Sequence, residues 1–192
     1  MSALDFYYDI ASPFSYIAAA RITPLAEAAG VTVRWRPFLL GGVFQAAGNK
    51  MPASVPARGR YMFTDLARWS KKTGVPFRFS SSFPHNSLLA MRALTAADDR
   101  ERVALSLALF RAAWVDDRDV SKPDVVGEAL GDRGPALIEA SGDPAVKERL
   151  RITTQAAIDA GAFGAPSFVV GDALYFGNDR LEWAIEAATG GA

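Results

Sequence analysis

Strand patterns occur only near the two ends of this chain, and the long segment between them carries mostly helical patterns. Residues 4–10 alternate apolar and polar side chains, and residues 31–35 repeat that alternation after a helical segment, so the chain opens as β-α-β. Residues 167–170 and 173–176 form a predicted hairpin, which a last helix follows. These patterns predict that both ends contribute to one α/β sheet domain, which an all-helical segment interrupts.

The segment between the two ends is irregular at first and then helical. Residues 36–55 are rich in Gly, Pro and Asn, which is typical of connecting structure. Helical patterns follow, and the stretch 103–115 is apolar on nearly every side, which indicates a buried central helix. We therefore expect a sheet domain built from residues 1–55 and 160–192, interrupted by a helical insertion over residues 56–159.

The first helix has a clear start signal. Ser12 is a favourable N-cap, and Pro13 fits the first helical position, where a missing N–H costs nothing. Thr23-Pro24 repeats this signal, so we expect a kink or a restart of the helix there. Three motifs thus stand out at strand ends and helix starts, namely Ser12-Pro13-Phe14-Ser15, Ala165-Pro166 and Gly177-Asn178-Asp179.

Composition excludes several kinds of site and partner. The 21 Lys and Arg balance 21 Asp and Glu, and no basic stripe indicates a nucleic-acid partner. No stretch approaches the ~20 apolar residues of a membrane-spanning helix, and the N-terminal pattern is not that of a signal peptide, so we expect a cytoplasmic protein. With no Cys and one His, disulfides, thiolate nucleophiles and multi-His metal sites are excluded. Carboxylate-only Mg²⁺ or Ca²⁺ sites stay open, although no calcium-loop spacing is present.

Five segments of the sequence together resemble one known family. They are FYYDIASPFSY (6–16), RPFLLGGVF (36–44), GNKMP (48–52), GAFGAPSFVV (161–170) and YFGNDRLEW (175–183). In this order they are similar to the thioredoxin-fold branch of disulfide oxidoreductases, kappa-class glutathione transferases and 2-hydroxychromene-2-carboxylate isomerases. The resemblance implies a thioredoxin-like α/β fold with an all-helical insertion, glutathione as cofactor, and a homodimer.

The start of the first helix is the expected catalytic site. A helix N-terminus presents unpaired N–H groups and a partial positive charge, so it binds anions. Redox members of the family carry Cys-x-x-Cys at this turn, whereas this chain reads Ser-Pro-Phe-Ser and has no cysteine. The resemblance therefore implies that bound glutathione supplies the thiol and that the Ser12 hydroxyl stabilises its thiolate. Read by itself, Ser12 is an ordinary N-cap.

The free energy that this role requires is modest. Lowering a thiol pKa from ~8.5 by about two units requires about 2.7 kcal/mol. A hydrogen bond to a charged group contributes about 1.5–3 kcal/mol, and a helix terminus contributes about 0.3–2 kcal/mol. Ser12 and the helix start together therefore suffice to hold a thiolate at neutral pH.

The resemblance also implies the other glutathione contacts. Pro166 is expected to follow a cis peptide bond that turns the Ala165 backbone toward the cysteinyl part of glutathione; the alternative is an ordinary trans proline. Asn178 and Asp179 match the positions that hold the γ-glutamyl end, although this pair also suits a helix cap. Asn49 matches the loop that covers the glycyl end.

Three further side chains have two interpretations each. Lys50 and Arg58 neutralise the glycyl carboxylate or a carboxylate of the substrate, or else they are solvated surface charges. His85 with Ser12 suggests a hydrolase triad, but the chain has no Gly-x-Ser-x-Gly elbow, so the triad is rejected. We interpret His85 as a loop or substrate-pocket residue.

Two glutathione-dependent reactions fit the family, and a third hypothesis is not catalytic. An isomerase adds the thiolate reversibly to an unsaturated aromatic keto acid, allows bond rotation and eliminates it again. A kappa-class transferase conjugates glutathione to a small electrophile. The third hypothesis is a module that binds glutathione or a peptide without catalysis. FYYDIASPFSY and YFGNDRLEW resemble the bacterial isomerases more closely, so we expect the isomerase.

Overall fold

The computed structural model describes residues 2–190 and contains one four-stranded mixed sheet, in the order β2-β1-β3-β4. β1 pairs in parallel with β2, so that Phe6 lies opposite Trp35, and it pairs antiparallel with β3, so that Phe6 also lies opposite Phe168. Both ends of the chain therefore contribute to one sheet, as the strand patterns predict. The strands are β1 (Ala3–Tyr8), β2 (Thr32–Pro37), β3 (Ser167–Val170) and β4 (Ala173–Phe176).

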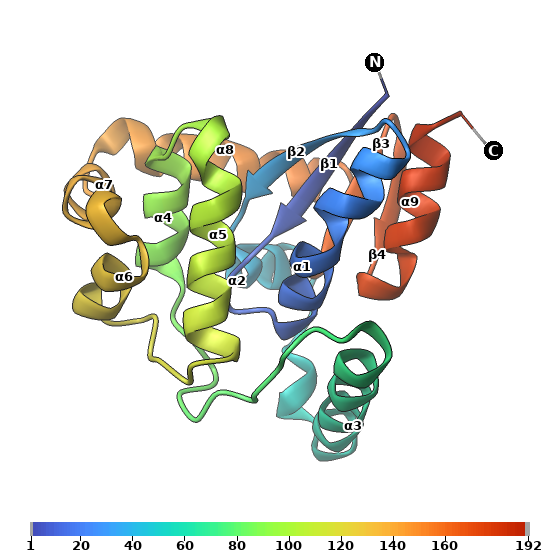
Figure 1. The fold of residues 1–192 in the computed structure, drawn as a ribbon, viewed down its shortest axis with the longest axis horizontal. Helices are drawn as coiled ribbons and strands as arrows, with labels where there is room; N and C mark the ends of the chain where they lie inside the picture. The colour runs from blue at the N-terminus through green and yellow to red at the C-terminus, as the bar shows by residue number, and fades with distance from the viewer. Residues whose placement is uncertain (1, 191–192) are drawn as a thin grey trace.

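Helices cover both faces of this sheet (Figure 1). The helices are α1 (Pro13–Ala28), α2 (Leu40–Ala46), α3 (Pro56–Thr73), α4 (Leu88–Ala96), α5 (Asp99–Trp114), α6 (Pro123–Ala129), α7 (Gly134–Ala140), α8 (Pro144–Asp159) and α9 (Leu181–Ala188). Short 3-10 turns, η1 (Pro52–Ser54), η2 (Gly131–Arg133) and η3 (Asn178–Arg180), connect some of them. This is the thioredoxin-like α/β fold with additional helices between β2 and β3.

Alternation along β1 separates the two cores. Phe6 and Tyr8 face the main core, which α1, α5 and α9 share, while Tyr7 faces a smaller core with α2 and α8. The Phe6 ring lies 5.1 Å from Tyr8 and 5.0 Å from Trp35. Burying each such side chain stabilises the fold by about 1.5–3 kcal/mol. The strand that leads into the first helix is therefore firmly held.

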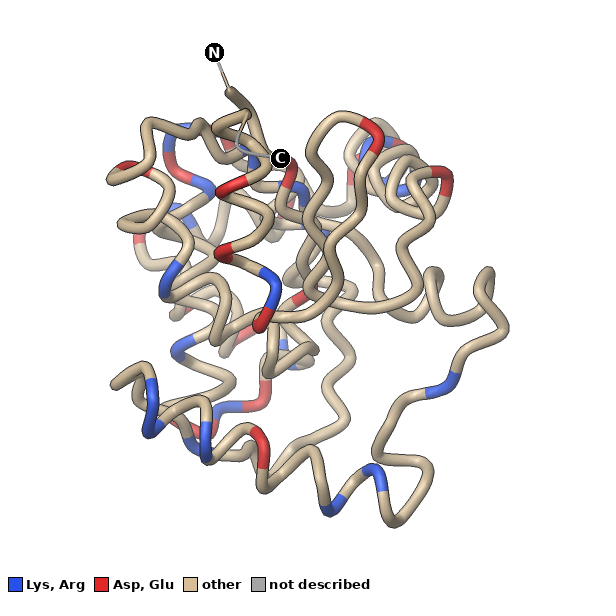
Figure 2. The backbone as a smooth tube through the Cα atoms, turned by 90° about the vertical axis from the view of Figure 1, so that its right-hand side faces the viewer, with Lys and Arg blue, Asp and Glu red and all other residues tan. Residues whose placement is uncertain are grey.

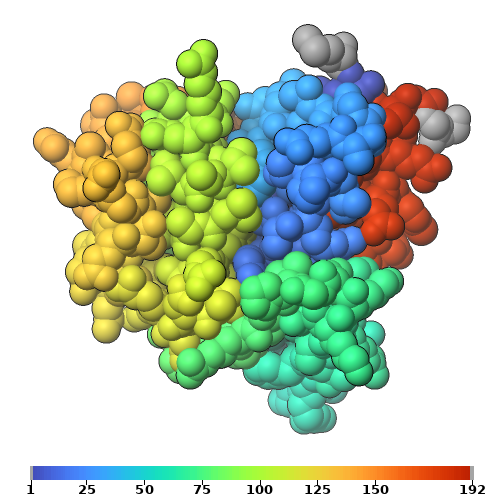
Figure 3. Space-filling model, viewed as in Figure 1, coloured from blue at the N-terminus to red at the C-terminus, as the bar shows by residue number. Residues whose placement is uncertain are grey.

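Helix α3 lies at the lower edge of the molecule, beneath α1 (Figures 1 and 3). Its contacts are mainly with η1 and α1, whereas α4 to α8 pack against one another and α8 also covers β2. The Arg21 guanidinium lies 5.4 Å above the Trp69 ring and helps to hold α3 in place. The division of the chain at residues 56 and 159 stays a prediction.

Two sequence expectations are wrong. The segment 36–55 is not irregular throughout, because β2 extends to Pro37 and α2 occupies Leu40–Ala46. The two glycines of α2 disfavour a helix locally, but Val43 of α2 is fully buried against α8, and this burial stabilises the helix. The helix does not restart at Pro24 either, because α1 is one element with Ile22 and Ala26 buried on both sides of the proline. The alternative expectation, a kink at Pro24, stays a prediction.

Charged residues of both signs are spread along the chain (Figure 2). Within residues 2–190, no helix combines the length and the apolar character needed to span a membrane. The same residues contain no cluster of three or more His, Asp and Glu side chains arranged to hold a metal ion.

Candidate active site

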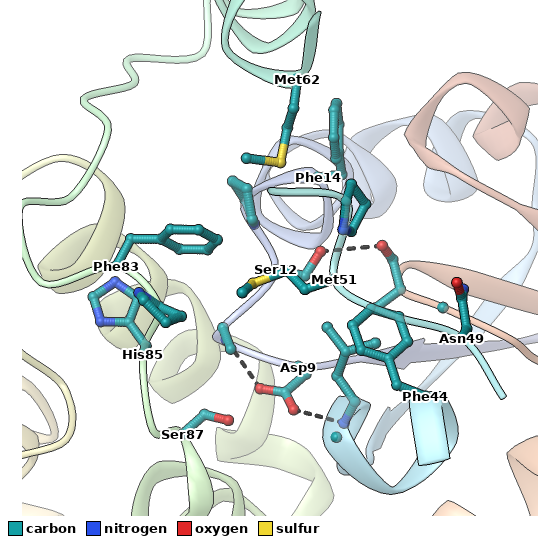
Figure 4. A pocket seen from close by; sticks show the side chains of 18 of the residues that line it. Asp9, Ser12, Phe14, Phe44, Asn49, Met51, Met62, Phe83, His85 and Ser87 are labelled. Atoms are coloured by element: carbon teal, nitrogen blue, oxygen red, sulfur yellow. Dashed lines mark hydrogen bonds between the residues drawn. The ribbon is translucent and has the colours of Figure 1, made fainter. Parts of the chain in front are cut away.

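A cavity of about 980 Å³ opens at the start of α1. Its walls come from four parts of the chain: the β1–α1 turn, the segment from α2 to α3, the loop before α4, and the residues that flank β3 and β4 (Figure 4). Most of the lining is apolar and includes Phe14, Leu39, Phe44, Met51, Tyr61, Met62, Phe83 and Phe176. Such a space suits an aromatic ligand with a few fixed polar contacts.

Ser12 lies in this wall as the N-cap of α1. Its hydroxyl oxygen accepts a hydrogen bond from the Ser15 backbone N–H at 3.1 Å, and its proton is donated to the Ala165 carbonyl at 3.1 Å. The Ala165–Pro166 peptide bond is cis, as predicted. The structure therefore brings together two of the three motifs, although Pro166 itself is not among the residues that line the cavity.

The third motif borders the same cavity. Asn178 is 4% exposed, and within the described residues its side-chain nitrogen has no hydrogen-bond partner. Asp179 is exposed and pairs with Arg180 at 2.8 Å. Gly177 precedes them with a φ of +98°, and a Cβ there would lie 2.5 Å from an Asp179 carboxylate oxygen, so this turn requires glycine.

The three residues predicted to contact the glycyl end of glutathione do not all line the cavity. Asn49 lines the cavity, and its side-chain nitrogen donates to the Phe163 carbonyl at 3.0 Å, which ties this loop to the segment before Ala165. Arg58 also lines the cavity, from the first turn of α3. Lys50 does not line it. Contacts from these three side chains to a ligand stay predictions.

Comparisons with known proteins agree with this fold. A family model described as "DSBA-like thioredoxin domain" matches residues 3–187. A 2-hydroxychromene-2-carboxylate isomerase of Sphingobium xenophagum is 34% identical over 185 residues, which cover 94% of each chain. Human glutathione S-transferase kappa 1 is 30% identical over 93% of this chain and 87% of its own. A solved structure of a 2-hydroxychromene-2-carboxylate isomerase has 32% identity and a TM-score of 0.85, over 98% of this chain and 94% of its own.

The chain belongs to this DSBA-like thioredoxin family. Its relatives of at least 30% identity are named isomerases and kappa-class glutathione transferases, so the chain is an enzyme of the isomerase and transferase branch. The resemblance that the five sequence segments indicate is thereby confirmed.

Asp9 also lines the cavity, and the sequence reasoning did not single it out. It is 2% exposed, and its carboxylate accepts hydrogen bonds from the Ala11 N–H at 2.9 Å and the Leu40 N–H at 2.8 Å. Burial raises the pKa of this carboxyl, against the opposing effect of hydrogen bonds from Ser87, Leu40 and Ala11. Asp9 thus connects the turn that carries Ser12 with the start of α2. Its position three residues before the N-cap is a signal that sequence reasoning can use.

Three charged side chains line the cavity besides Asp9. Arg58 and Asp65 come from α3, and Asp179 follows β4. Partial burial and the nearby Asp179 raise the pKa of Asp65. A ligand with both a carboxylate and an ammonium group therefore finds a partner for each.

Proposed function

We propose that this chain is a glutathione-dependent isomerase of the 2-hydroxychromene-2-carboxylate type, which interconverts unsaturated aromatic keto acids. The proposal rests on the Ser12 hydroxyl, which lies at the start of α1 and 3.1 Å from the Ala165 carbonyl, in a protein without cysteine. The names of the relatives support this reaction class.

The residues present fit glutathione, a tripeptide with two carboxylates, an ammonium group and a thiol. The helix start and Ser12 offer hydrogen-bond donors to an anion. The unpartnered side-chain nitrogen of Asn178, among the described residues, needs an acceptor. Arg58 suits a carboxylate, and Asp65 and Asp179 suit an ammonium group. Glutathione bound here supplies a thiolate that adds to a double bond and leaves it again.

Ser12 acts by turning its hydroxyl proton. In the free protein this proton is donated to the Ala165 carbonyl, while the oxygen is held by the Ser15 N–H. Rotation about the Cβ–Oγ bond redirects the proton toward a sulfur anion, and the Ala165 carbonyl becomes available to a ligand N–H. The apolar walls exclude water and hold the aromatic part of the substrate, so the chain's residues orient the reactants and stabilise the anion.

Replacing Ser12 tests this role. Ser12→Ala removes the donor, and we expect at least a tenfold fall in turnover and loss of the ultraviolet thiolate absorbance of bound glutathione at neutral pH. Ser15→Ala is a matched control, because the buried Ser15 hydroxyl has no partner among the described residues. Unchanged kinetics in Ser12→Ala would remove Ser12 from catalysis.

The second candidate is a kappa-class transferase, which the human relative favours. A paired assay separates the candidates: the enzyme and glutathione are mixed with the chromene acid or with a chlorodinitrobenzene-type electrophile. Isomerisation without net loss of glutathione supports the isomerase, and stoichiometric consumption supports the transferase. Glutathione binding without turnover of either compound indicates a non-catalytic module. The homodimer and the cytoplasmic location stay predictions.

A further inference from the structure

His85 is a buried polar side chain of the cavity wall that the proposed mechanism leaves unused. It is 8% exposed, and neither ring nitrogen has a hydrogen-bond partner among residues 2–190. Burial lowers the pKa of this imidazole, so the ring is neutral at pH 7 and carries one donor and one acceptor. Leaving both unpaired in a buried site costs free energy that a ligand can recover.

The protein around His85 does not offer the missing partners. The ring meets the edge of Trp114, with centroids 5.0 Å apart and planes at 82°. The two carboxylates that influence its titration are engaged elsewhere. Asp117 accepts from the Ser81 N–H at 2.7 Å and pairs with Arg78, and Asp119 accepts from the hydroxyl of Ser121 at 2.6 Å.

His85 lines the cavity, but both of its ring nitrogens are buried in the observed orientation, so a ligand would reach them only after the ring turns. His85 lies with Phe83 at one end of the cavity, across from Phe44 and Asn49 (Figure 4). A half turn about the Cβ–Cγ bond exchanges each nitrogen with a ring carbon while the outline of the ring stays the same. The neighbouring aromatic side chains therefore accept either orientation.

The residues near His85 limit which chemical group of a ligand its imidazole can bind. Phe83 and Met51 near this end suit an aromatic ring. Buried Asp9, which lines the same cavity, disfavours a carboxylate here. Arg58, the basic residue among the described lining, comes from α3 instead. The group that fits the imidazole is a neutral oxygen on an aromatic ring.

We propose that His85 determines specificity by hydrogen-bonding a ring hydroxyl of the aromatic substrate. This inference rests on the proposed function, because it assumes that the cavity takes an aromatic substrate beside glutathione. It predicts that the enzyme prefers hydroxylated aromatic substrates over otherwise identical ones, and that this preference depends on one side chain.

Two matched enones test this specificity without glutathione, namely ortho-hydroxybenzylideneacetone and benzylideneacetone. Quenching of tryptophan fluorescence gives their dissociation constants, since Trp114 lies beside His85. We expect wild-type protein to bind the hydroxylated enone about tenfold more tightly, and His85→Phe to bind both about equally. Phe83→Leu is the control, which weakens both enones by a similar factor because it removes apolar contact only.

A second measurement on the wild-type protein needs no variant. The chain has one His, so its imidazole nitrogen signals are unique in an NMR spectrum. The hydroxylated enone should shift these signals and the other enone should not. Equal affinity of wild-type protein for both enones, binding of neither, or a full preference in folded His85→Phe would overturn the proposal. These titrations contain no glutathione. A separate finding that the protein does not bind glutathione would contradict the proposed function and not the hydrogen bond from His85.

Discussion

At the residue scale, Ser12 joins two segments that lie 153 positions apart in the chain. Its cap geometry follows from local rules, since Ser before Pro is a common helix start. Its second partner, the Ala165 carbonyl, depends on how β1 and β3 pair, and no local pattern contains that information. Ser12 was therefore predictable as a cap, whereas its role in the cavity required the family resemblance and then the fold.

His85 should make the stability of the protein depend on pH. Burial lowers its pKa in the folded state, so the unfolded chain binds more protons below its ordinary pKa of ~6.5. The stability that neutral His85 contributes is present above that value and is lost as the pH falls toward the lowered pKa of the folded state.

Denaturant unfolding at about pH 7 and about pH 5 measures this loss. His85→Gln keeps a polar side chain that does not titrate, so we expect the free energy of unfolding to fall less in this variant than in wild-type protein. An equal fall in both proteins would show that burial does not shift this pKa.

At the scale of elements, the Ser12-Pro13 signal located the start of α1, whereas the similar Thr23-Pro24 signal marked no new helix. Asp143 before Pro144 is the same kind of local start signal, and its carboxylate caps α8 by accepting from the Ala145 N–H at 2.7 Å. Helix α2 was missed, because its glycines oppose a helix locally and burial of Val43 against α8 supplies the stabilisation. Caps act within a few residues of sequence, whereas burial depends on distant partners.

The contact between α6 and α7 should not tolerate a side chain at Gly134. A Cβ at this position would lie only 2.2 Å from the Gly127 carbonyl oxygen, which is backbone and cannot move aside cheaply. We expect Gly134→Ala to lower the free energy of unfolding by about 1–3 kcal/mol. Thermal unfolding measures the change.

Gly41→Ala is the control for that substitution. Gly41 lies in α2, is exposed and has nothing within 4 Å of an added Cβ. Alanine there should be neutral or stabilising by up to about 1 kcal/mol, because it favours the helix. Equal effects of the two substitutions would argue against the close approach of α6 and α7.

At the scale of the whole molecule, the cavity exists only because four parts of the chain meet. The β1–α1 turn, the segment from α2 to α3, the loop before α4, and the residues that flank β3 and β4 all border it. A ligand that binds here connects both ends of the chain with the helical part. Unfolding then requires release of the ligand.

Glutathione should therefore stabilise the folded protein. At a concentration one hundred times its dissociation constant, it should raise the free energy of unfolding by about 2.7 kcal/mol, which a thermal shift detects. The analogue with a methyl group in place of the thiol, at the same concentration, should stabilise the protein less because it offers Ser12 no thiolate. If both compounds stabilise the protein equally, the contact between Ser12 and the thiolate does not contribute to glutathione binding.

The sequence by itself determined the order of strands and helices along the chain, the cap of α1, and the absence of a cysteine nucleophile, because these are properties of composition and of short-range patterns. Only the tertiary structure decided that Asp9 is buried beneath Ser12, that Lys50 lies outside the cavity wall while Arg58 lines it, and that both His85 nitrogens are enclosed. The physical reason is that burial and hydrogen-bond partners come from segments that are distant along the chain, and their meeting depends on packing of the whole fold.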